Sequence, residues 1–190
     1  MAEGTLHLLG ISGSLRRESF NTGLLRAAQE VAPAGVEVTI ADISHVPLYN
    51  EELNTDNQPP AVLAFKDAIR HADALLFAVP EYNYSIPGVL KNAIDWASRP
   101  IKTSPLNGKP AGMMGVGGMY GTVRAQMHLR QIGVATNMLL LNRPELMIQM
   151  PTGKFASDGL LTDPQLREKV KVLLESLRDW TLRLRGVAVD

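Results

Sequence analysis

Apolar residues along the chain fall into short uninterrupted runs, separated by longer stretches in which apolar positions recur at helical spacing. Runs without alternation are typical of strands that are covered on both faces, as in a parallel sheet. Four such runs are predicted as buried strands: 6–11 (LHLLGI), 74–79 (ALLFAV), 111–116 (AGMMGV) and 137–142 (NMLLLN). A fifth run, 36–43 (VEVTIADI), alternates more and suits a strand nearer the edge of the sheet.

Between these runs the apolar positions recur every three or four residues, which is typical of helices packed on one face. The expected helices cover about 21–32, 62–72, 87–98, 120–133 and 166–184. Pro87 suits the first position of the third helix, and Thr162 or Asp163 suits the cap of the last. Because strands and helices alternate from end to end, the sequence predicts an α/β doubly wound sheet in one domain spanning 1–190. The irregular stretches 44–60 and 98–110 are expected to be long loops within it.

Composition and charge narrow the functional classes. A chain of 190 residues is long enough for one domain with a sizeable core. Its 19 basic and 19 acidic residues balance, which argues against general nucleic-acid binding. No signal-peptide pattern or membrane-length apolar run is found, so a cytoplasmic protein without a membrane partner is expected. Cysteine is absent, so any redox chemistry must come from a bound cofactor.

Ligands of doubly wound sheets bind beyond the carboxyl ends of the strands. Three polar or glycine-rich segments follow expected strand ends: 13–23 (GSLRRESFNTG), 80–88 (PEYNYSIPG) and 115–124 (GVGGMYGTVR). We therefore expect these three segments to form the functional site.

The first segment joins a buried strand to a helix, whose unpaired N–H groups and partial positive charge suit a phosphate. Gly13 permits a tight turn there. The side chains that can add hydrogen bonds or charge are those of Ser14, Ser19, Asn21, Thr22 and either Arg16 or Arg17. The alternative is an exposed loop with a well-capped helix, since such residues are common at helix starts without any ligand. The position at the end of the first strand favours the phosphate.

Two familiar nucleotide motifs are absent from the sequence. The pair Gly108-Lys109 is followed by proline and does not form a Walker loop. Neither GISGSLR nor GVGGMYG has the G-x-G-x-x-G spacing of a dinucleotide fingerprint.

The second segment places two tyrosines, Asn83, Ser85 and several backbone amides beyond a buried strand that ends at Pro80. Such a mixture suits a planar heteroaromatic ring, which needs an apolar wall and a few donors at its carbonyl edge. An aromatic-rich loop at a subunit contact is the alternative. The glycines of the third segment suit either the close approach of a flat ligand or a tight strand-to-helix turn.

No catalytic triad, carboxylate pair or metal-ligand spacing is found, so no catalytic side chain and no metal are predicted. The four histidines, at positions 7, 45, 71 and 128, are scattered and are expected to be surface or packing residues. Arg99 and Arg124 are candidates for attracting an anionic electron acceptor or the phosphate of a nicotinamide cofactor. Surface or interface ion pairs are the alternative for both arginines.

Four segments, GSLRRESFN, PLYNEEL, PEYNYSIPGVLKNAIDWASRP and RAQMHLRQ, resemble signature segments of the NADPH-dependent FMN reductase family. That family includes bacterial quinone and chromate reductases of the flavodoxin-like superfamily, and the resemblance covers about residues 6–150. It implies a flavodoxin-like, five-stranded parallel sheet in the order 2-1-3-4-5. It also implies FMN as the cofactor, NADPH or NADH as the co-substrate, and a homodimer or homotetramer with flavin sites near the subunit contact.

The resemblance also assigns residues to the cofactor. It implies that the FMN phosphate is held by Ser14, Arg16, Ser19, Asn21 and Thr22, with Phe20 packed nearby. Pro80, Glu81, Tyr82, Asn83 and Ser85 would border the isoalloxazine ring on one side, and Gly117, Gly118 and Tyr120 on the other. Met127 stands where close relatives often have an aromatic residue, and 115–124 has fewer serines than is usual. These departures leave the acceptor and the subunit packing open.

The implied activity is a ping-pong oxidoreduction, in which NAD(P)H reduces bound FMN and leaves before the acceptor enters. A quinone is the expected acceptor, and chromate or other small acceptors are further candidates. The alternative is a flavodoxin-type electron carrier without its own NAD(P)H turnover. Neutral net charge and the arginines of the first loop count against a carrier of that kind, and a flavin-free regulatory or scaffold protein on the same fold is a third candidate.

Overall fold

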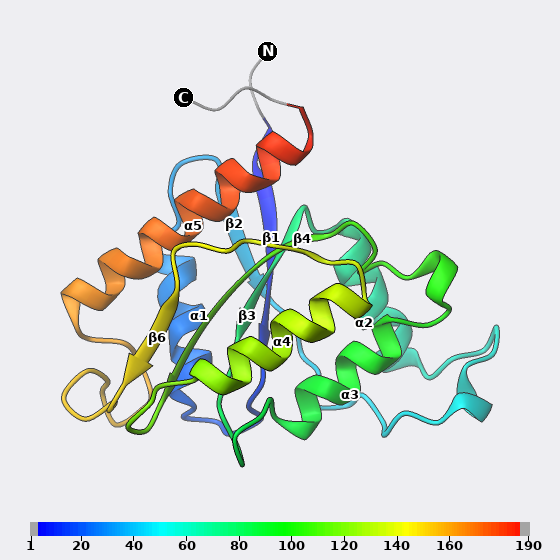
Figure 1. The fold of residues 1–190 in the computed structure, drawn as a ribbon, viewed down its shortest axis with the longest axis horizontal. Helices are drawn as coiled ribbons and strands as arrows, with labels where there is room; N and C mark the ends of the chain where they lie inside the picture. Colours follow the sequence, from blue (N-terminus) through cyan, green and yellow to red (C-terminus); the bar gives the residue numbers. More distant parts are fainter. Residues whose placement is uncertain (1–3, 187–190) are drawn as a thin grey trace.

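A parallel β-sheet forms the middle layer of the molecule in the computed structural model, which describes residues 4–186 (Figure 1). Its four longer strands are β1 (Leu6–Ser12), β2 (Val36–Ile40), β3 (Ala74–Ala78) and β4 (Pro110–Gly117). Two short strands, β5 (Leu139–Leu140) and β6 (Leu146–Gln149), both pair with β4. The order β2-β1-β3-β4-β5 confirms the predicted doubly wound topology.

Beside β4, at the edge of the sheet, the structure has two short strands instead of the single strand that was expected over 137–142. Only β5 lies within that range, and β6 then pairs with the later residues of β4. The chain leaves the sheet between them, where Pro144 has no N–H to donate to a neighbouring strand. There the guanidinium of Arg130 binds the carbonyls of Leu141 and Asn142, at 3.3 and 3.2 Å. The fifth strand is therefore divided into two segments.

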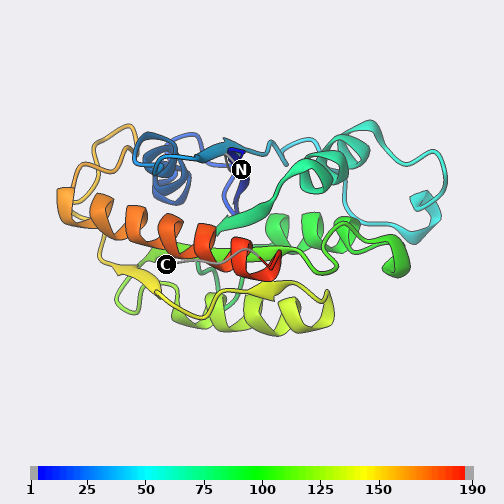
Figure 2. The same ribbon diagram turned by 90° about the horizontal axis from the view of Figure 1, so that it is seen from above.

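Helices cover both faces of the sheet, as the view from above shows (Figure 2). The helices α1 (Phe20–Glu30) and α5 (Pro164–Leu184) pack on one face. The opposite face is covered by α2 (Pro60–His71), α3 (Gly88–Ala97) and α4 (Val123–Ala135). Successive strand residues point to opposite faces of the sheet. Leu8 therefore lies in the core on the α1 and α5 side, and Leu9 in the core on the side of α2, α3 and α4. Across residues 4–186, no helix is long and apolar enough to span a membrane.

Local signals explain where the helices begin. Ser19 caps α1, because its Oγ accepts a hydrogen bond from the Thr22 N–H at 3.4 Å. Asp163, rather than Thr162, caps α5 by accepting from the Leu166 N–H at 2.9 Å. The two long loops each contain a short 3₁₀ helix, η1 (Glu51–Leu53) and η2 (Ile101–Thr103).

The carboxyl ends of β1, β3 and β4 lead to the same edge of the sheet, at the bottom of Figure 1. The loops 13–19, 79–87 and 118–122 leave the strands there and precede α1, α3 and α4. They are called the first, second and third loop below.

Candidate functional site

The first loop begins at the end of β1 and is held against the end of β3. The Gly13 N–H donates to the Ala78 carbonyl at 2.9 Å. Glycine is needed here, because a Cβ on this residue would lie 2.8 Å from Cδ of Pro80. Inside the loop, Ser14 is almost fully buried and its Oγ accepts from the Arg16 N–H at 3.3 Å. The loop is thus fixed by backbone contacts and by its own serine.

The N-terminus of α1 opens onto this loop. The first-turn N–H groups of Phe20 and Asn21 have no intrahelical acceptor, as at the start of any helix. The Arg16 guanidinium lies over the Phe20 ring, 5.3 Å from its centroid. Arg16 and Arg17 are exposed, and within residues 4–186 neither forms an ion pair. The Thr22 hydroxyl lies 2.8 Å from that of Ser12, and this hydrogen bond fixes its orientation at the start of α1.

Asn21 is more deeply engaged than its neighbours. Its side chain is buried, its Nδ2 donates to the Val116 carbonyl and its Oδ1 accepts from the Val116 N–H, both at 3.0 Å. The register of β3 with β4 ends at the pair Ala78 and Met114, so Val116 lies beyond it. The amide of Asn21 therefore takes the place of a strand neighbour and joins α1 to β4. A direct contact with a phosphate stays a prediction for this residue.

The second loop is a tight hairpin. Tyr82 and Ser85 exchange both backbone hydrogen bonds, each at 3.0 Å. The two residues between them have positive φ, +50° for Asn83 and +67° for Tyr84, which is the conformation of a type I′ turn. A tyrosine at positive φ is uncommon and strained, and strain of this kind is concentrated at functional sites. Both tyrosine side chains are more than half exposed.

Glu81 connects the second loop to the start of α4. Its carboxylate is only 6% exposed. One oxygen accepts from the backbone N–H groups of Arg124 and Ala125, at 2.9 and 3.2 Å. The other accepts from Nε of Arg124 at 2.6 Å and also forms an ion pair with its Nη2. Glu81 therefore caps α4 and neutralises Arg124.

The Arg124 side chain also lies near two aromatic rings. Its guanidinium lies 3.7 Å from the ring centroid of Tyr84 and 5.1 Å from that of Tyr120. The hydrogen bond to Glu81 is the main cause that raises the pKa of Arg124 above its ordinary value. Arg124, which the sequence suggested as a residue that attracts an anion, is thus paired with the Glu81 carboxylate of its own chain. It joins the second loop to the third.

The third loop turns sharply between β4 and α4. Gly118 and Gly121 pair across the turn at 3.1 Å, and Gly121 has φ +60°. A Cβ on Gly117 would overlap the Gly121 carbonyl, so the glycines serve the turn itself. Tyr120 at the tip is 58% exposed. The glycines serve a tight turn, and the close approach of a flat ligand is compatible with the same geometry, since the exposed tip can border a ligand.

A fourth segment, which the sequence did not single out, lies against the start of α1. The Phe155 ring packs on Phe20 with centroids 4.8 Å apart. Gly159 is in contact with Gly23 and with the Glu18 backbone, so closely that a Cβ on either glycine would collide. The sequence contains a turn signal for this segment, the dipeptide Asp158-Gly159 before the last helix.

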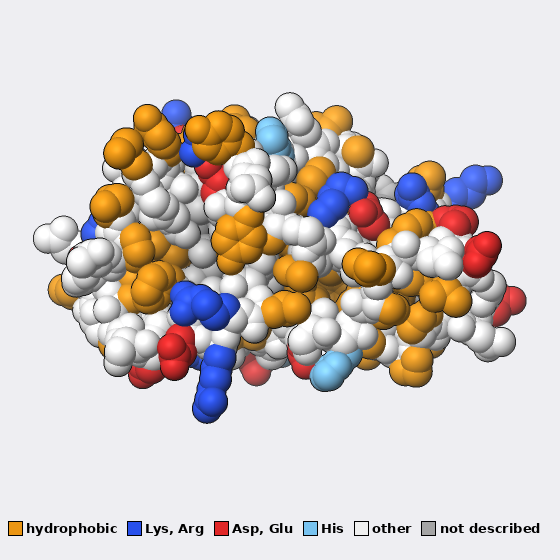
Figure 3. Space-filling view, turned by 90° about the horizontal axis from the view of Figure 1, so that it is seen from below, with side chains coloured by type: hydrophobic (Ala, Val, Ile, Leu, Met, Phe, Trp, Pro, Cys, Tyr) orange, Lys and Arg blue, Asp and Glu red, His pale blue; other side chains and the backbone are white. Residues whose placement is uncertain are grey.

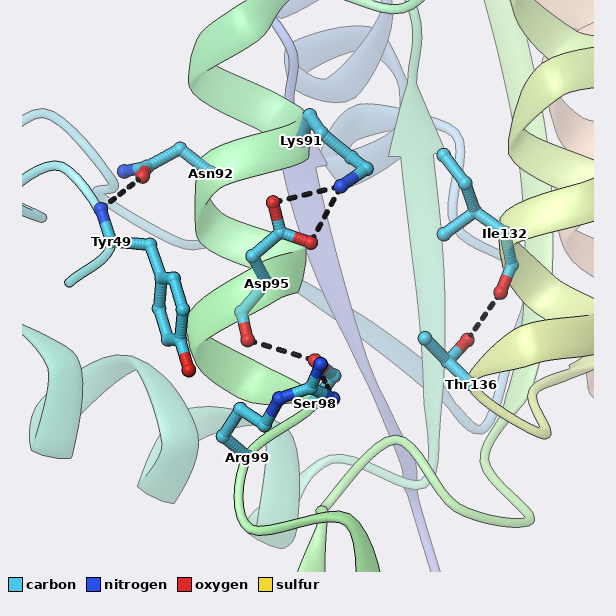
Figure 4. Close-up of polar contacts among 8 residues, drawn as sticks. All are labelled: Tyr49, Lys91, Asn92, Asp95, Ser98, Arg99, Ile132 and Thr136. Atoms are coloured by element: carbon cyan, nitrogen blue, oxygen red, sulfur yellow. Dashed lines mark hydrogen bonds and ion pairs between the residues drawn. The ribbon is translucent and has the colours of Figure 1, made fainter. Parts of the chain in front are cut away.

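Arg99 lies apart from these loops. It follows the C-terminal end of α3, about 15 Å along the helix from the second loop at 1.5 Å per residue. Its Nη1 donates to Ser98 Oγ at 3.4 Å. Arg99 borders a cavity of about 270 Å³ between α3 and α4, together with Lys91 and Ile132 (Figure 4). Within this chain, the structure does not bring Arg99 together with the predicted cofactor residues.

The turn that carries Arg99 is fixed by a buried lysine. Lys66 of α2 is 2% exposed, and its Nζ donates to the Arg99 carbonyl at 2.5 Å and to Gln58 Oε1 at 2.7 Å. Loss of hydration is the main cause that lowers the pKa of Lys66. The loop before α2 is also tied to α3, because the Tyr49 N–H donates to Asn92 Oδ1 at 2.8 Å (Figure 4).

The helix N-termini at this edge differ in charge balance. At α4 the carboxylate of Glu81 already occupies the first amides. The first turn of α1 contains no acidic residue, and Arg16, Arg17 and Glu18 precede it, two positive charges against one negative. Seen from below, this face of the molecule has hydrophobic side chains across its middle, with basic and acidic ones beside them (Figure 3). A phosphate at α1 and a planar ring along the tyrosine and glycine loops fit these residues, as FMN requires.

Sheet order and loop positions define a flavodoxin-like protein. The family model for NADPH-dependent FMN reductase matches residues 6–153, and the chain belongs to that family. An NAD(P)H-dependent FMN reductase of Pseudomonas aeruginosa is 50% identical over 182 residues, covering 95% of this chain and 98% of the relative. An NADPH:quinone oxidoreductase of Arabidopsis thaliana is 45% identical over 188 residues, covering 95% and 94%. The solved structure of FerB, a flavoenzyme NAD(P)H:(acceptor) oxidoreductase from Paracoccus denitrificans, superposes with a TM-score of 0.83 at 34% identity, covering 94% of this chain and 98% of FerB.

Proposed function

We propose that the chain is an FMN-dependent NAD(P)H oxidoreductase that reduces quinones by ping-pong turnover. The observation that carries the proposal is the start of α1, which offers free amides, hydroxyls and two arginines without an ion-pair partner in residues 4–186, next to a loop of exposed tyrosines. Family membership supports FMN and NAD(P)H, and the name of the Arabidopsis thaliana relative supports a quinone as the acceptor.

The phosphate of FMN is proposed to bind the α1 amides with Ser14, Ser19, Thr22 and Arg16. Asn21 then acts by positioning this loop on β4, and Phe20 forms its apolar floor with Phe155. The ring is proposed to lie along Pro80, Glu81, Tyr82, Asn83 and Ser85, with Gly117, Gly118 and Tyr120 on its other side.

Bound FMN would accept hydride and pass on its electrons, which no side chain of this site can do. The protein's own part is to bind, orient and shield. The backbone amides of the loops would stabilise negative charge at the ring edge, and the Glu81–Arg124 pair would hold the second and third loops in register. No metal site is proposed, since residues 4–186 contain no cluster of three potential ligands.

Apolar side chains on the open side of α4 support a homodimer or homotetramer. Val123, Met127 and Val134 are 40%, 44% and 83% exposed on this one helix. The cavity beside Arg99, between α3 and α4, borders other residues of α4, namely Ile132, Ala135 and Thr136. A role of Arg99 toward an acceptor is proposed only for such an oligomer, in which it would face a flavin bound by the other copy.

The test is steady-state oxidation of NADPH and of NADH by the purified protein, with FMN, without any added reductase. The acceptor panel contains a quinone, chromate and free flavin, and free FMN without protein is the control. Turnover with a quinone supports the proposal. Bound FMN without turnover would indicate a flavodoxin-type carrier instead, and failure to bind FMN would contradict both.

A further inference from the structure

A serine of the second loop is hydrogen bonded to a histidine that the reaction as described does not use. Ser85 Oγ lies 2.9 Å from Nδ1 of His128. The backbone N–H and carbonyl of Ser85 are both engaged with Tyr82, each at 3.0 Å. The hydroxyl is therefore the part of Ser85 that is free to turn, and His128, exposed on α4, is its partner.

The direction of this hydrogen bond depends on the charge of the imidazole. When Nδ1 carries no proton, it accepts, and the Ser85 hydroxyl donates its hydrogen to it. When the imidazole is charged, both ring nitrogens carry protons, so Nδ1 donates and Ser85 Oγ accepts. The hydroxyl hydrogen is then free to point elsewhere along the loop. A distance of 2.9 Å suits either direction.

The other charged groups around this contact are paired. The titratable or charged residues of the second loop, α3 and the preceding turn of α4 are Glu81, Tyr82, Tyr84, Lys91, Asp95 and Arg124. Arg124 is paired with Glu81. Lys91 is paired with Asp95 at 2.7 Å, as Figure 4 shows. Histidine is the side chain in this set that ordinarily changes charge between about pH 5 and 8.

We propose that His128 is a positioning residue of the flavin site, which sets the direction of the Ser85 hydroxyl through a hydrogen bond that reverses on protonation. The inference rests on the proposed function, because Ser85 belongs to the loop assigned to the isoalloxazine ring. With charged His128, the hydroxyl can donate to a carbonyl at the ring edge. With neutral His128 in the tautomer that carries its proton on Nε2, Nδ1 accepts from the hydroxyl and that donor is withdrawn. FMN should therefore bind about two- to tenfold more tightly at pH 5.5 than at pH 8.5, the range expected for one hydrogen bond.

The experiment measures the dissociation constant of FMN by flavin fluorescence between pH 5.5 and 8.5. The FMN phosphate also titrates in this range, so each variant is compared with the unmodified protein. His128→Asn places an amide near the position of Nδ1 that hydrogen bonds to Ser85 without titrating, and it should bind FMN without the pH step that His128 contributes. Ser85→Ala should lose the same step. His45→Asn, at an exposed histidine of another loop, is the matched control and should keep it.

A second readout needs no flavin. Ring-proton NMR of the histidines in the apoprotein should give a His128 titration curve that changes in Ser85→Ala, while that of His45 does not. An unchanged His128 curve would overturn the inference. FMN binding with the full pH step retained in His128→Asn would overturn it as well, and would leave the proposed function intact. Absence of FMN binding at every pH would overturn the proposed function itself.

Discussion

Replacement of Asn21 by alanine tests whether this residue holds the protein together or only holds a ligand. The side chain is 5% exposed and satisfies both the N–H and the carbonyl of Val116, itself buried. Alanine would leave both backbone groups without a partner. Each such buried group costs about 1–3 kcal/mol. Because the contact lies at the end of the sheet, where water can partly replace it, we expect a total loss of about 2–4 kcal/mol.

For a chain of 190 residues, a loss of this size lowers the melting temperature by roughly 5–15 °C. Asn21→Asp should lose at least as much, because its carboxylate can accept from the Val116 N–H but turns an oxygen toward the Val116 carbonyl. The control is Asn57→Ala, an exposed asparagine whose side chain forms no hydrogen bond in the described part of the chain.

The assay is thermal unfolding of the apoprotein followed by circular dichroism, with FMN titration of each variant alongside. Destabilised apoprotein is the predicted result for Asn21→Ala, with Asn57→Ala unchanged. A variant with unaltered melting temperature and weakened FMN binding would refute this reasoning, because it would make Asn21 a ligand contact rather than a link between α1 and β4.

Three further predictions address charges. Because the pKa of Lys66 is lowered by burial, the unfolded chain binds more protons as pH approaches the unfolded value of about 10.5, so stability should rise with pH there. Lys66→Met should remove this rise in urea unfolding, and equal slopes would contradict it. Burial favours the neutral form of Asp73, but the hydrogen bonds that it accepts, including one from Arg185, lower its pKa. Its contribution to stability should be lost as pH falls below about 3.9, and Asp73→Asn should flatten that acid limb. Arg16→Ala should weaken FMN binding by about 10- to 150-fold, as for a charge-assisted phosphate contact, and Arg17→Ala by less; unchanged affinity in Arg16→Ala would show that this side chain only faces solvent.

The parts of the fold that follow from short-range pattern could be predicted from the sequence. Uninterrupted apolar runs indicated the buried strands, and their alternation with helical stripes indicated a doubly wound sheet, whereas the strand order followed from the family resemblance. Since parallel strands present their carboxyl ends at one edge, the three loops of the site could also be placed together. Ser19 was expected near the start of α1 because cap chemistry is local, and it is the cap.

The contacts that could not be predicted join residues far apart in the chain. Asn21 and Val116 are separated by 95 positions, and nothing in the local sequence indicates that an asparagine will complete the edge of a strand. Glu81 could be expected near a ligand, but its role as cap of α4 depends on a helix that begins about 40 residues later. The division of the last strand depends on Pro144 and on Arg130 of α4, whose guanidinium reaches the carbonyls of Leu141 and Asn142 only in the folded protein.

The central claim is that FMN bound by these three loops carries electrons from NAD(P)H to a quinone. Its most direct test is an anaerobic titration of the FMN-loaded protein, first with NADPH or NADH and then with a quinone, followed by flavin absorbance. We predict that one equivalent of reduced nicotinamide bleaches the flavin absorbance and that the quinone restores it, with hydroquinone formed in equal amount. Flavin that stays oxidised with both nicotinamides, or reduced flavin that the quinone fails to reoxidise, would contradict the claim.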